Sequence, residues 1–409
     1  MVEGLPLRTV ADRFGTPLYV YSKCSIIDQC RSFERVFDGL EHQTSYAVKA
    51  NSNRALLRII AGEGLGADVG SKGEMFLALD AGFSPDKIAF SGVGKRDDEI
   101  RYALERGVES FNVESEEEIS VLGQIAVSMG KSADILLRVN LDIDAGGHAY
   151  VSTSLKRNKF GIDWQQAGGV LQWAKGVPGI RIRGIHSHLG SQIVDVETFL
   201  TAARRLADLV NDLRRTEIQV TDLDFGGGYG VQYRGFVAHP KLPPEEPQEL
   251  SLPTASLVQA VLPILQGTGC RLLIQPGRSI VAYAGALLVK VIYRKVSDER
   301  VFIIVDGGMN DLIRPSLYNA YHQIVPLTIT GAPHEKVDVV GPLCESGDFF
   351  AHGRMLPRSQ RGDALAIMCA GAYGYVLSSN YNARLRPAEV LVDGTTMIII
   401  RERETLGDL

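Results

Sequence analysis

The chain has few cysteines, and their spacing excludes the usual structural uses. It contains 5 cysteines in 409 residues, an odd number, and none of them forms a C-x-x-C pair. A disulfide-stabilised secreted fold and a structural zinc site are therefore not expected. A cysteine with a special function in this chain is expected to be a catalytic thiol.

Long apolar runs and an excess of positive charge are also absent. Runs such as Val301–Val305 fall far short of the roughly 20 residues that cross a bilayer, so no membrane span is predicted. Lys and Arg number 43 against 48 Asp and Glu, which predicts no nucleic-acid partner. The N-terminal segment MVEGLPLRTVADRFG lacks the apolar stretch of a signal peptide, and a cytoplasmic protein is expected.

What the chain does contain is a regular alternation of strand and helix patterns. Hydrophobic residues make up 45% and charged residues 22%, as in ordinary globular proteins of two or three domains. Eight short strand candidates alternate with helical stretches, which is typical of parallel β/α units. These candidates are Thr44–Val48, Gly66–Val69, Ile88–Ser91, Ser110–Val113, Asp134–Val139, Ile182–His186, Thr221–Phe225 and Leu272–Gln275.

Eight units predict an α/β fold of the (β/α)8 TIM-barrel type over residues 25–276, close to the roughly 250 residues such a barrel needs. The competing topology is an open doubly wound sheet, but no G-x-G-x-x-G follows an early strand to support its dinucleotide-binding version. We expect a second, mostly antiparallel β domain. It would comprise residues 277–409 together with residues 1–24, which contribute the strand Leu18–Tyr21. The proline-rich segment His239–Pro253 predicts a surface loop.

Reactive side chains follow several of the predicted barrel strands, at the end where barrel enzymes gather their active sites. They are Lys49, Asp68, His188, the glycines Gly226–Gly228 and Arg278. A lysine amine can form a Schiff base with a carbonyl, and a glycine loop can approach a phosphate. Pyridoxal 5′-phosphate (PLP) carries both an aldehyde and a phosphate, so the set favours PLP. His186 and His188 have no third ligand nearby, and no metal is predicted.

Seven motifs occur in order along nearly the whole chain: YAVKAN, HSHLGSQ, GGGYG, PGRSIV, DGGMNDLIRPSLY, GPLCESGD and GAYGYVLSSNYN. Together they resemble the fold-type III PLP-dependent decarboxylases, which have an alanine racemase-like barrel. The RNKFGI segment at 157–162 and the segment Leu312–Tyr318 point to the diaminopimelate branch of that family.

The resemblance implies cofactor roles for residues of both predicted domains. Lys49 would bind PLP covalently, His188 would stack on its ring and Asp68 with Glu74 would position Lys49. Glu74 has an equally good alternative, because Ser71 and Glu74 fit the capping-box spacing of a helix start. Residues that would contact the phosphate or its surroundings are Ser191, Gly228, Gly277, Arg278 and Tyr373.

The resemblance also implies substrate contacts and a proton donor. Arg278, Arg314 and Tyr318, with Glu345 and Tyr373, would hold the far end of the substrate. A guanidinium binds a carboxylate in bidentate fashion, and Glu345 would pair with an ammonium group. Cys344 would protonate the substrate carbon, and this role is favoured over the alternative that it is a small buried apolar residue. The motif that contains Cys344 reaches the neighbouring subunit in related enzymes, which implies a homodimer with shared active sites.

One residue departs from the family pattern. The family has Glu-Pro-Gly-Arg where this chain has Gln275-Pro-Gly-Arg, and the family glutamate keeps the pyridine nitrogen of PLP protonated. A neutral amide can bond that nitrogen but cannot supply the charge. Slower catalysis, compensation by another acid and a deliberate substitution all remain open explanations.

The activity implied is decarboxylation of meso-2,6-diaminopimelate at its D-centre to L-lysine and CO₂, the last step of lysine biosynthesis. Two alternatives are kept. One is a decarboxylase of ornithine, carboxynorspermidine or another amino acid or polyamine precursor. The other is a non-catalytic regulatory protein with the same fold, which would need neither Lys49 nor Cys344.

Overall fold

The computed structural model describes most of the chain. The described residues are 1–144, 159–243, 254–298 and 300–409. Two residues of the RNKFGI motif, Arg157 and Asn158, and the second part of the predicted loop His239–Pro253 lie outside them. No helix in the described ranges is both long and apolar enough to cross a membrane.

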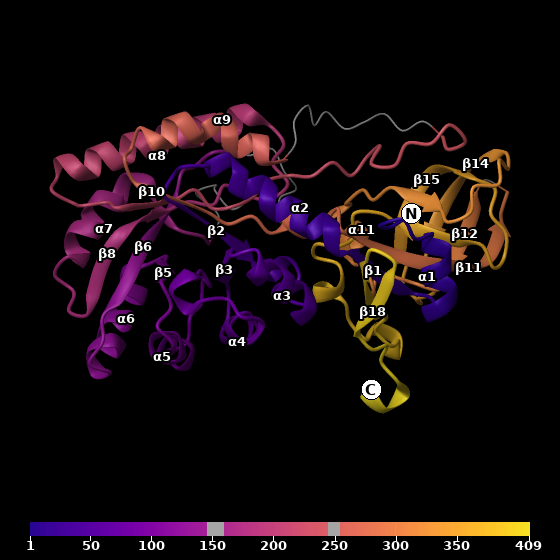
Figure 1. The fold of residues 1–409 in the computed structure, drawn as a ribbon, viewed down its shortest axis with the longest axis horizontal. Helices are drawn as coiled ribbons and strands as arrows, with labels where there is room; N and C mark the ends of the chain where they lie inside the picture. Colours follow the sequence, from indigo (N-terminus) through magenta and orange to yellow (C-terminus); the bar gives the residue numbers. More distant parts are fainter. Residues whose placement is uncertain (145–158, 244–253, 299) are drawn as a thin grey trace. The chain divides into compact units, whose positions relative to one another are not determined.

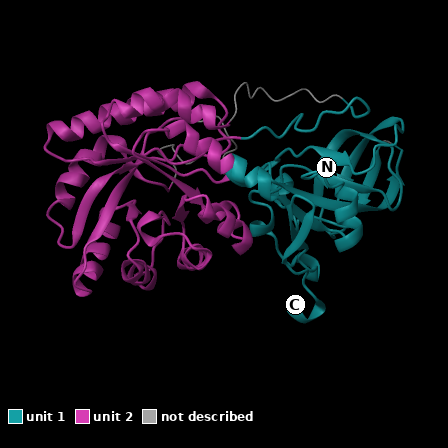
Figure 2. Cartoon of the chain, in the orientation of Figure 1, with its two compact units in different colours: residues 1–28, 231–251, 280–409 teal, residues 29–230, 252–279 magenta. Residues whose placement is uncertain are grey.

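The chain divides into two compact units, shown in different colours in Figure 2. Unit 2 comprises residues 29–230 and 252–279, and unit 1 comprises the remaining segments, 1–28, 231–251 and 280–409. The units differ from the predicted domains mainly in residues 231–251, which belong to unit 1 although they precede the last barrel strand.

The core of unit 2 is a closed parallel barrel (Figure 1). Among the described residues, eight strands pair in chain order, and the barrel closes where the last strand pairs with the first. The strands are β2 (His42–Ala47), β3 (Gly66–Val69), β4 (Ile88–Phe90), β5 (Ser110–Val113), β6 (Ala133–Asn140), β8 (Ile180–His186), β9 (Asp222–Asp224) and β10 (Arg271–Ile274). A two-residue strand, β7 (Ile162–Asp163), adds to β6. The predicted barrel is confirmed, and the open sheet is excluded.

The barrel strands are flanked by helices, of which the first precedes β2 and the others follow strands. They are α2 (Lys23–Glu34), α3 (Arg54–Gly62), α4 (Lys72–Ala81), α5 (Asp97–Arg106), α6 (Glu116–Ser128), α7 (Ala167–Ala174), α8 (Val196–Arg215) and α9 (Thr254–Gln266). At the start of α4 the Ser71 hydroxyl accepts the backbone N–H of Glu74 at 3.2 Å. The Glu74 carboxylate accepts from Gly70 N–H at 2.7 Å rather than from Ser71, so only half of a capping box forms.

Unit 1 is built on a mostly antiparallel sheet, as predicted. Its strands are β1 (Leu18–Ser22), β11 (Gly285–Val296), β12 (Val301–Val305), β13 (Ile324–Pro326), β14 (His334–Val340), β15 (Phe349–Pro357), β16 (Ala364–Ile367), β17 (Ala388–Asp393) and β18 (Thr396–Arg401). The order is β15-β14-β12-β11-β1-β17-β18, with β16 pairing β11 and β13. The N-terminal strand β1 lies between β11 and β17 and is parallel only to β17.

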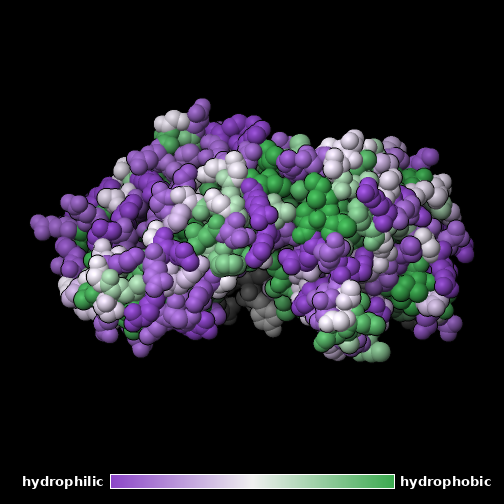
Figure 3. Space-filling model, turned by 60° about the horizontal axis from the view of Figure 1, so that its bottom comes forward, coloured by the Kyte–Doolittle hydropathy of each residue, from purple (hydrophilic) through white to green (hydrophobic). Residues whose placement is uncertain are grey.

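An apolar core holds helix α1 to this sheet, and two further short helices lie wholly or partly in this unit. The helices are α1 (Leu7–Phe14), α10 (Arg278–Val281), which continues from unit 2, and α11 (Arg314–Tyr318). Leu7 and Val10 of α1 pack with buried side chains of β1 and β11, such as Leu18 and Leu288. The face of the molecule in Figure 3 is mostly hydrophilic with scattered apolar patches, as expected for a surface that covers such cores.

Candidate active site

Lys49 follows strand β2 and lies beside a buried carboxylate. Its Nζ is 4.0 Å from Asp68 Oδ2, and its side chain is 49% exposed whereas that of Asp68 is 3% exposed. Among the described residues, the other oxygen of Asp68 is buried and has no hydrogen-bond partner. The barrel therefore presents an accessible amine together with an unused acceptor, both at strand ends.

Glu74 belongs to the same electrostatic group. Burial raises the pKa of the Glu74 carboxyl, the bond from Gly70 N–H lowers it, and the charges of Asp68 and Lys49 act on it in opposite directions. The carboxylate thus bonds the chain just before α4 and also interacts with Lys49. In this position Glu74 can both bond the chain at the start of α4 and help to position Lys49.

The two histidines of the HSHLGSQ motif are held neutral. Enclosure in the barrel, with the positive charges of Lys49 and Arg138, keeps the pKa of His188 well below its usual value. Burial and nearby positive charges likewise lower the pKa of His186, an effect that the neighbouring Gln275 side chain partly offsets. Gly227 N–H donates to His188 Nδ1 at 3.1 Å, so a neutral His188 carries its proton on Nε2. The described residues contain no group of three side chains suited to a metal.

The glycines after β9 are required by close backbone approach. A Cβ on Gly226 would lie 2.2 Å from Ser187 O, and one on Gly228 would lie 2.5 Å from Gly190 O. Both glycines also have positive φ angles, of 70° and 95°. The GGGYG motif therefore fits its loop against the loop after β8. That packing is a reason for glycine in addition to the predicted approach to a phosphate.

Gln275 makes a contact that the sequence pattern did not predict. Its Nε2 donates to Asp224 Oδ2 at 2.7 Å, and Asp224 Oδ1 accepts from Gly226 N–H at 2.8 Å. Asp224 is 1% exposed, and burial raises its pKa to about 8. The one feature of the sequence that could have singled out Asp224 is its position at the end of a strand, just before the glycines. A titratable acid therefore lies directly beside the departure from the family pattern.

The remaining barrel residues also gather at strand ends. Arg278 is 8% exposed and donates from Nη2 to Ser191 Oγ at 2.8 Å. A Cβ on Gly277 would lie 2.9 Å from the Ala47 Cβ, so a larger residue would push the PGR turn away from β2. The predicted site residues that lie within unit 2 are Lys49, Asp68, Glu74, His188, Ser191, Gly228, Gln275, Gly277 and Arg278.

This set of donors fits PLP. The accessible Lys49 amine suits an aldehyde, and the neutral His188 ring offers a flat face without a charge. The orphaned Asp68 oxygen can accept a hydrogen bond in a buried place where it would otherwise be costly. Arg278 and Ser191 supply a cation and a hydroxyl of the kind that bind phosphate.

In unit 1, Arg314 begins helix α11 and is 4% exposed. Its Nη1 lies 2.8 Å from His322 Nε2, and its guanidinium carbon lies 4.8 Å from the centre of the Tyr233 ring. Tyr318 is the last residue of the same helix. His322 was not singled out by sequence reasoning, since its contact depends on how the chain turns after α11.

The loop with Cys344 and Glu345 is exposed but anchored. The carboxylate of Asp348 accepts from Met309 N–H at 2.6 Å and from Leu343 N–H at 2.7 Å. Cys344 N–H donates to Asn382 Oδ1 at 3.1 Å. The Cys344 thiol itself is exposed, so the alternative interpretation as a buried apolar residue is wrong for this chain.

Tyr373 lies in a turn that constrains its backbone. Its φ is 54°, a left-handed value that a tyrosine rarely adopts. A Cβ on nearby Gly371 would lie 1.9 Å from Val281 O, so this loop packs tightly against the chain that leads from α10. The turn therefore fixes the direction in which the Tyr373 side chain leaves the backbone.

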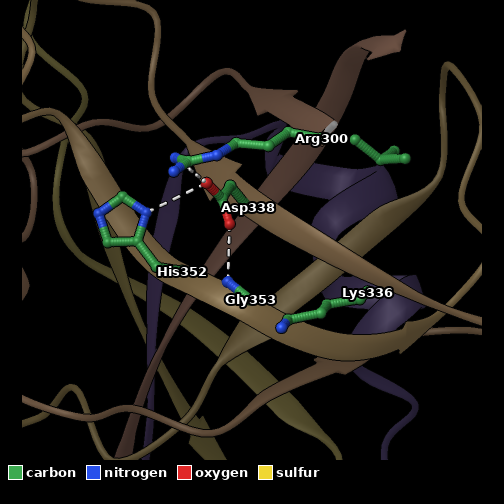
Figure 4. Close-up of a pocket in the computed structure, with 6 residues that line it drawn as sticks. Arg300, Lys336, Asp338, His352 and Gly353 are labelled. Atoms are coloured by element: carbon green, nitrogen blue, oxygen red, sulfur yellow. Dashed lines mark hydrogen bonds and ion pairs between the residues drawn. The ribbon is translucent and has the colours of Figure 1, made fainter. Parts of the chain in front are cut away.

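A surface pocket of about 530 Å³ in unit 1 is lined by none of the predicted site residues. Figure 4 shows Asp338 at its centre, 3.3 Å from His352 Nδ1 and 3.4 Å from Arg300 Nη1. Gly353 N–H also donates to Asp338, at 2.6 Å. Because Asp338 already pairs with both cationic groups, we assign no ligand to this pocket.

Comparisons with known proteins agree with the resemblance. A family model described as the pyridoxal binding domain of pyridoxal-dependent decarboxylases matches residues 23–282. A diaminopimelate decarboxylase from Pseudomonas fluorescens is 46% identical over 408 residues, which cover 100% of this chain and 95% of that protein.

Two solved structures are similar over almost the full length. One is the diaminopimelate decarboxylase of Helicobacter pylori complexed with L-lysine, with a TM-score of 0.90, 38% identity and 98% of both chains covered. The other is the M. jannaschii enzyme in complex with L-lysine, with a TM-score of 0.91 and 34% identity. It covers 100% of this chain and 94% of that chain.

Proposed function

Because the chain belongs to the pyridoxal-dependent decarboxylases, we propose that it converts meso-2,6-diaminopimelate to L-lysine and CO₂ with PLP as its cofactor. The observation that carries the proposal is the accessible Lys49 amine beside the buried Asp68 at the mouth of the barrel. Relatives that are named diaminopimelate decarboxylases and match over their full length support the choice of substrate.

The barrel residues hold the cofactor. Lys49 would bind it covalently, and Asp68 with Glu74 would fix the position of the amine. His188 would contact the ring as a neutral imidazole, and Gln275 would offer its amide to the ring nitrogen. Residues that hold the phosphate and its surroundings are Ser191, Gly228, Gly277, Arg278 and Tyr373. When bound, PLP withdraws the electron pair that CO₂ leaves on the substrate carbon.

The remaining residues recognise the substrate and return the proton. Diaminopimelate carries a carboxylate and an ammonium group at its far end. Arg314, with Arg278, binds that carboxylate in bidentate fashion, and Glu345 pairs with the ammonium group. Tyr318 and Tyr373 complete the pocket.

Cys344 delivers its thiol proton to the carbon that has lost CO₂. The GPLCESGD loop supplies Cys344 and Glu345 to the barrel of a second copy, which makes the protein a homodimer with shared active sites. The exposure of Cys344 on an anchored loop supports such a contact. As a biosynthetic enzyme of this type, the protein works in the cytoplasm.

The test measures CO₂ released from meso-, LL- and DD-diaminopimelate and from ornithine, by purified protein with added PLP. Release from the meso isomer alone is the expected result. Faster turnover of ornithine than of diaminopimelate would contradict the proposal and favour a decarboxylase of a polyamine precursor. PLP binding without CO₂ release from any of the four would favour the non-catalytic regulator.

A further inference from the structure

Arg314 is held by a neutral histidine in the interior of unit 1. Its Nη1 donates to His322 Nε2 at 2.8 Å, and His322 is fully buried. The other ring nitrogen of His322 lies 2.8 Å from the backbone oxygen of Met368, just after strand β16. The imidazole therefore joins the start of α11 to the end of β16.

The two partners of His322 decide its tautomer. A backbone oxygen can only accept a hydrogen bond, so the proton lies on Nδ1, which faces Met368. A guanidinium can only donate, so Nε2 must offer a lone pair to Arg314. Only the neutral ring with its proton on Nδ1 satisfies both contacts.

The surrounding side chains keep the ring in place. Tyr233 packs edge-on against His322 with 5.1 Å between ring centres, and the Arg314 guanidinium lies over the same tyrosine at 4.8 Å. Arg354 donates to the backbone oxygen of His322 at 3.0 Å. The imidazole and the guanidinium thus share one aromatic neighbour and have little freedom to turn.

We propose that His322 is a positioning residue for substrate selection, which fixes one arm of Arg314 so that the guanidinium receives the far carboxylate of diaminopimelate. The inference rests on the proposed function, because it needs Arg314 to bind that carboxylate. A histidine suits this task since it accepts a hydrogen bond without adding negative charge. An aspartate or glutamate in its place would compete with the substrate for the guanidinium.

The test compares two substitutions of His322 with a matched histidine elsewhere. His322→Gln keeps an acceptor for Arg314 and a donor for Met368, whereas His322→Phe keeps only the ring. The control is His334→Phe, since His334 is exposed on β14 of the same unit. The measurements are KM and kcat for meso-diaminopimelate and the inhibition constant of D-lysine. D-lysine is meso-diaminopimelate without its far carboxylate.

We expect His322→Phe to raise KM about 10- to 100-fold, as for a lost hydrogen bond to a charged group, with a smaller change in kcat. The inhibition constant of D-lysine should stay unchanged, and His322→Gln should restore KM to within about threefold of the original. His334→Phe should leave KM, kcat and the inhibition constant of D-lysine unchanged.

Two results would overturn the inference. One is an unchanged KM in a folded His322→Phe protein. The other is an equal loss of diaminopimelate and D-lysine binding, which would show a general structural role. If His322→Phe does not fold, His322→Glu serves instead, because its carboxylate pairs with Arg314 and should raise KM for diaminopimelate alone. An original protein that releases no CO₂ from meso-diaminopimelate would refute the proposed function instead.

Discussion

The barrel unit and the β unit hold their candidate site residues by different physical means. In the barrel, His188 and Asp224 stand at strand ends where enclosure shifts their pKa values. In unit 1, Cys344 stands on an exposed loop whose backbone is tied by Asp348 and Asn382. The barrel controls protonation through burial, whereas the β unit controls position through hydrogen bonds to loop backbone.

This difference predicts two kinds of response to substitution. Changes in the barrel should alter cofactor binding or the pH dependence of the reaction. Changes in the loops of unit 1 should alter kcat or KM while the cofactor stays bound. The comparison would be wrong if a barrel substitution altered only kcat or KM, or if a loop substitution in unit 1 altered cofactor binding.

Lys49→Ala should have the largest effect. Without the amine the protein loses its covalent link to PLP, and CO₂ release should fall by about 10⁴-fold or more. The absorbance band of the PLP-bound protein should disappear after dialysis. Lys72→Ala is a matched control, because Lys72 is a partly exposed lysine of the same unit that pairs with Asp98 on the surface. A persistent band in Lys49→Ala would show that another amine binds the cofactor.

Cys344→Ser should lower kcat by about 10²- to 10³-fold, the usual value of a positioned proton donor, and leave PLP absorbance intact. Serine keeps the size of the side chain but is a much weaker acid. Cys24→Ser provides the control, since Cys24 is the other exposed cysteine of unit 1. Equal kcat values for the two variants would contradict the proposed role of Cys344.

How much of the molecule the sequence predicts also differs between the units. The eight barrel strands are short, buried and bounded by capped helices, so their pattern is clear and their limits shift by only a residue or two. In unit 1 the pattern did not predict β13, which has only three residues. It also missed β15, where His352, Gly353 and Arg354 interrupt the apolar alternation.

For the candidate site as well, the sequence predicts local features better than contacts between distant residues. Motifs singled out the proposed barrel residues, most of which lie at or just after the end of a strand. The contact between Asp224 and Gln275 joins the last residue of β9 to the residue that directly follows the neighbouring strand β10, and a helix separates the two in the chain. The contact of His322 with Met368 joins residues that are far apart in the chain. Such contacts depend on tertiary structure, and no local spacing predicts them.

Asp348→Asn should have a moderate effect. An amide can replace only one of the two carboxylate oxygens that accept from Met309 and Leu343, and the loss of one such bond costs about 1–3 kcal/mol. We expect kcat to fall about tenfold as Cys344 loses its fixed position, with unchanged PLP absorbance. Kinetics and thermal unfolding of the same preparation check this. A loss of PLP absorbance instead would mean that the two units are not independent in this respect.

Gln275→Glu should have the smallest effect on kcat, and it should raise kcat whereas the other substitutions lower it. The new carboxyl group would lie beside Asp224, where the amide now donates at 2.7 Å. Two buried carboxyl groups at that distance share one proton. Burial already raises the pKa of Asp224 to about 8, so at neutral pH Asp224 keeps the proton and residue 275 is the anion. An anion that faces the ring nitrogen should raise kcat severalfold, up to about tenfold.

The pH dependence sharpens this last prediction. The new carboxylate of Gln275→Glu raises the pKa of Asp224 further above about 8, so the gain should be lost only at a pH well above 8, where Asp224 ionises and the two buried anions repel each other. In the double variant Asp224→Asn, Gln275→Glu, residue 224 stays neutral, so the gain should persist at high pH. Profiles of kcat from pH 6 to well above pH 8 for the original protein and both variants provide the measurement. An unchanged or lower kcat in Gln275→Glu with PLP bound would show that charge at position 275 does not limit catalysis.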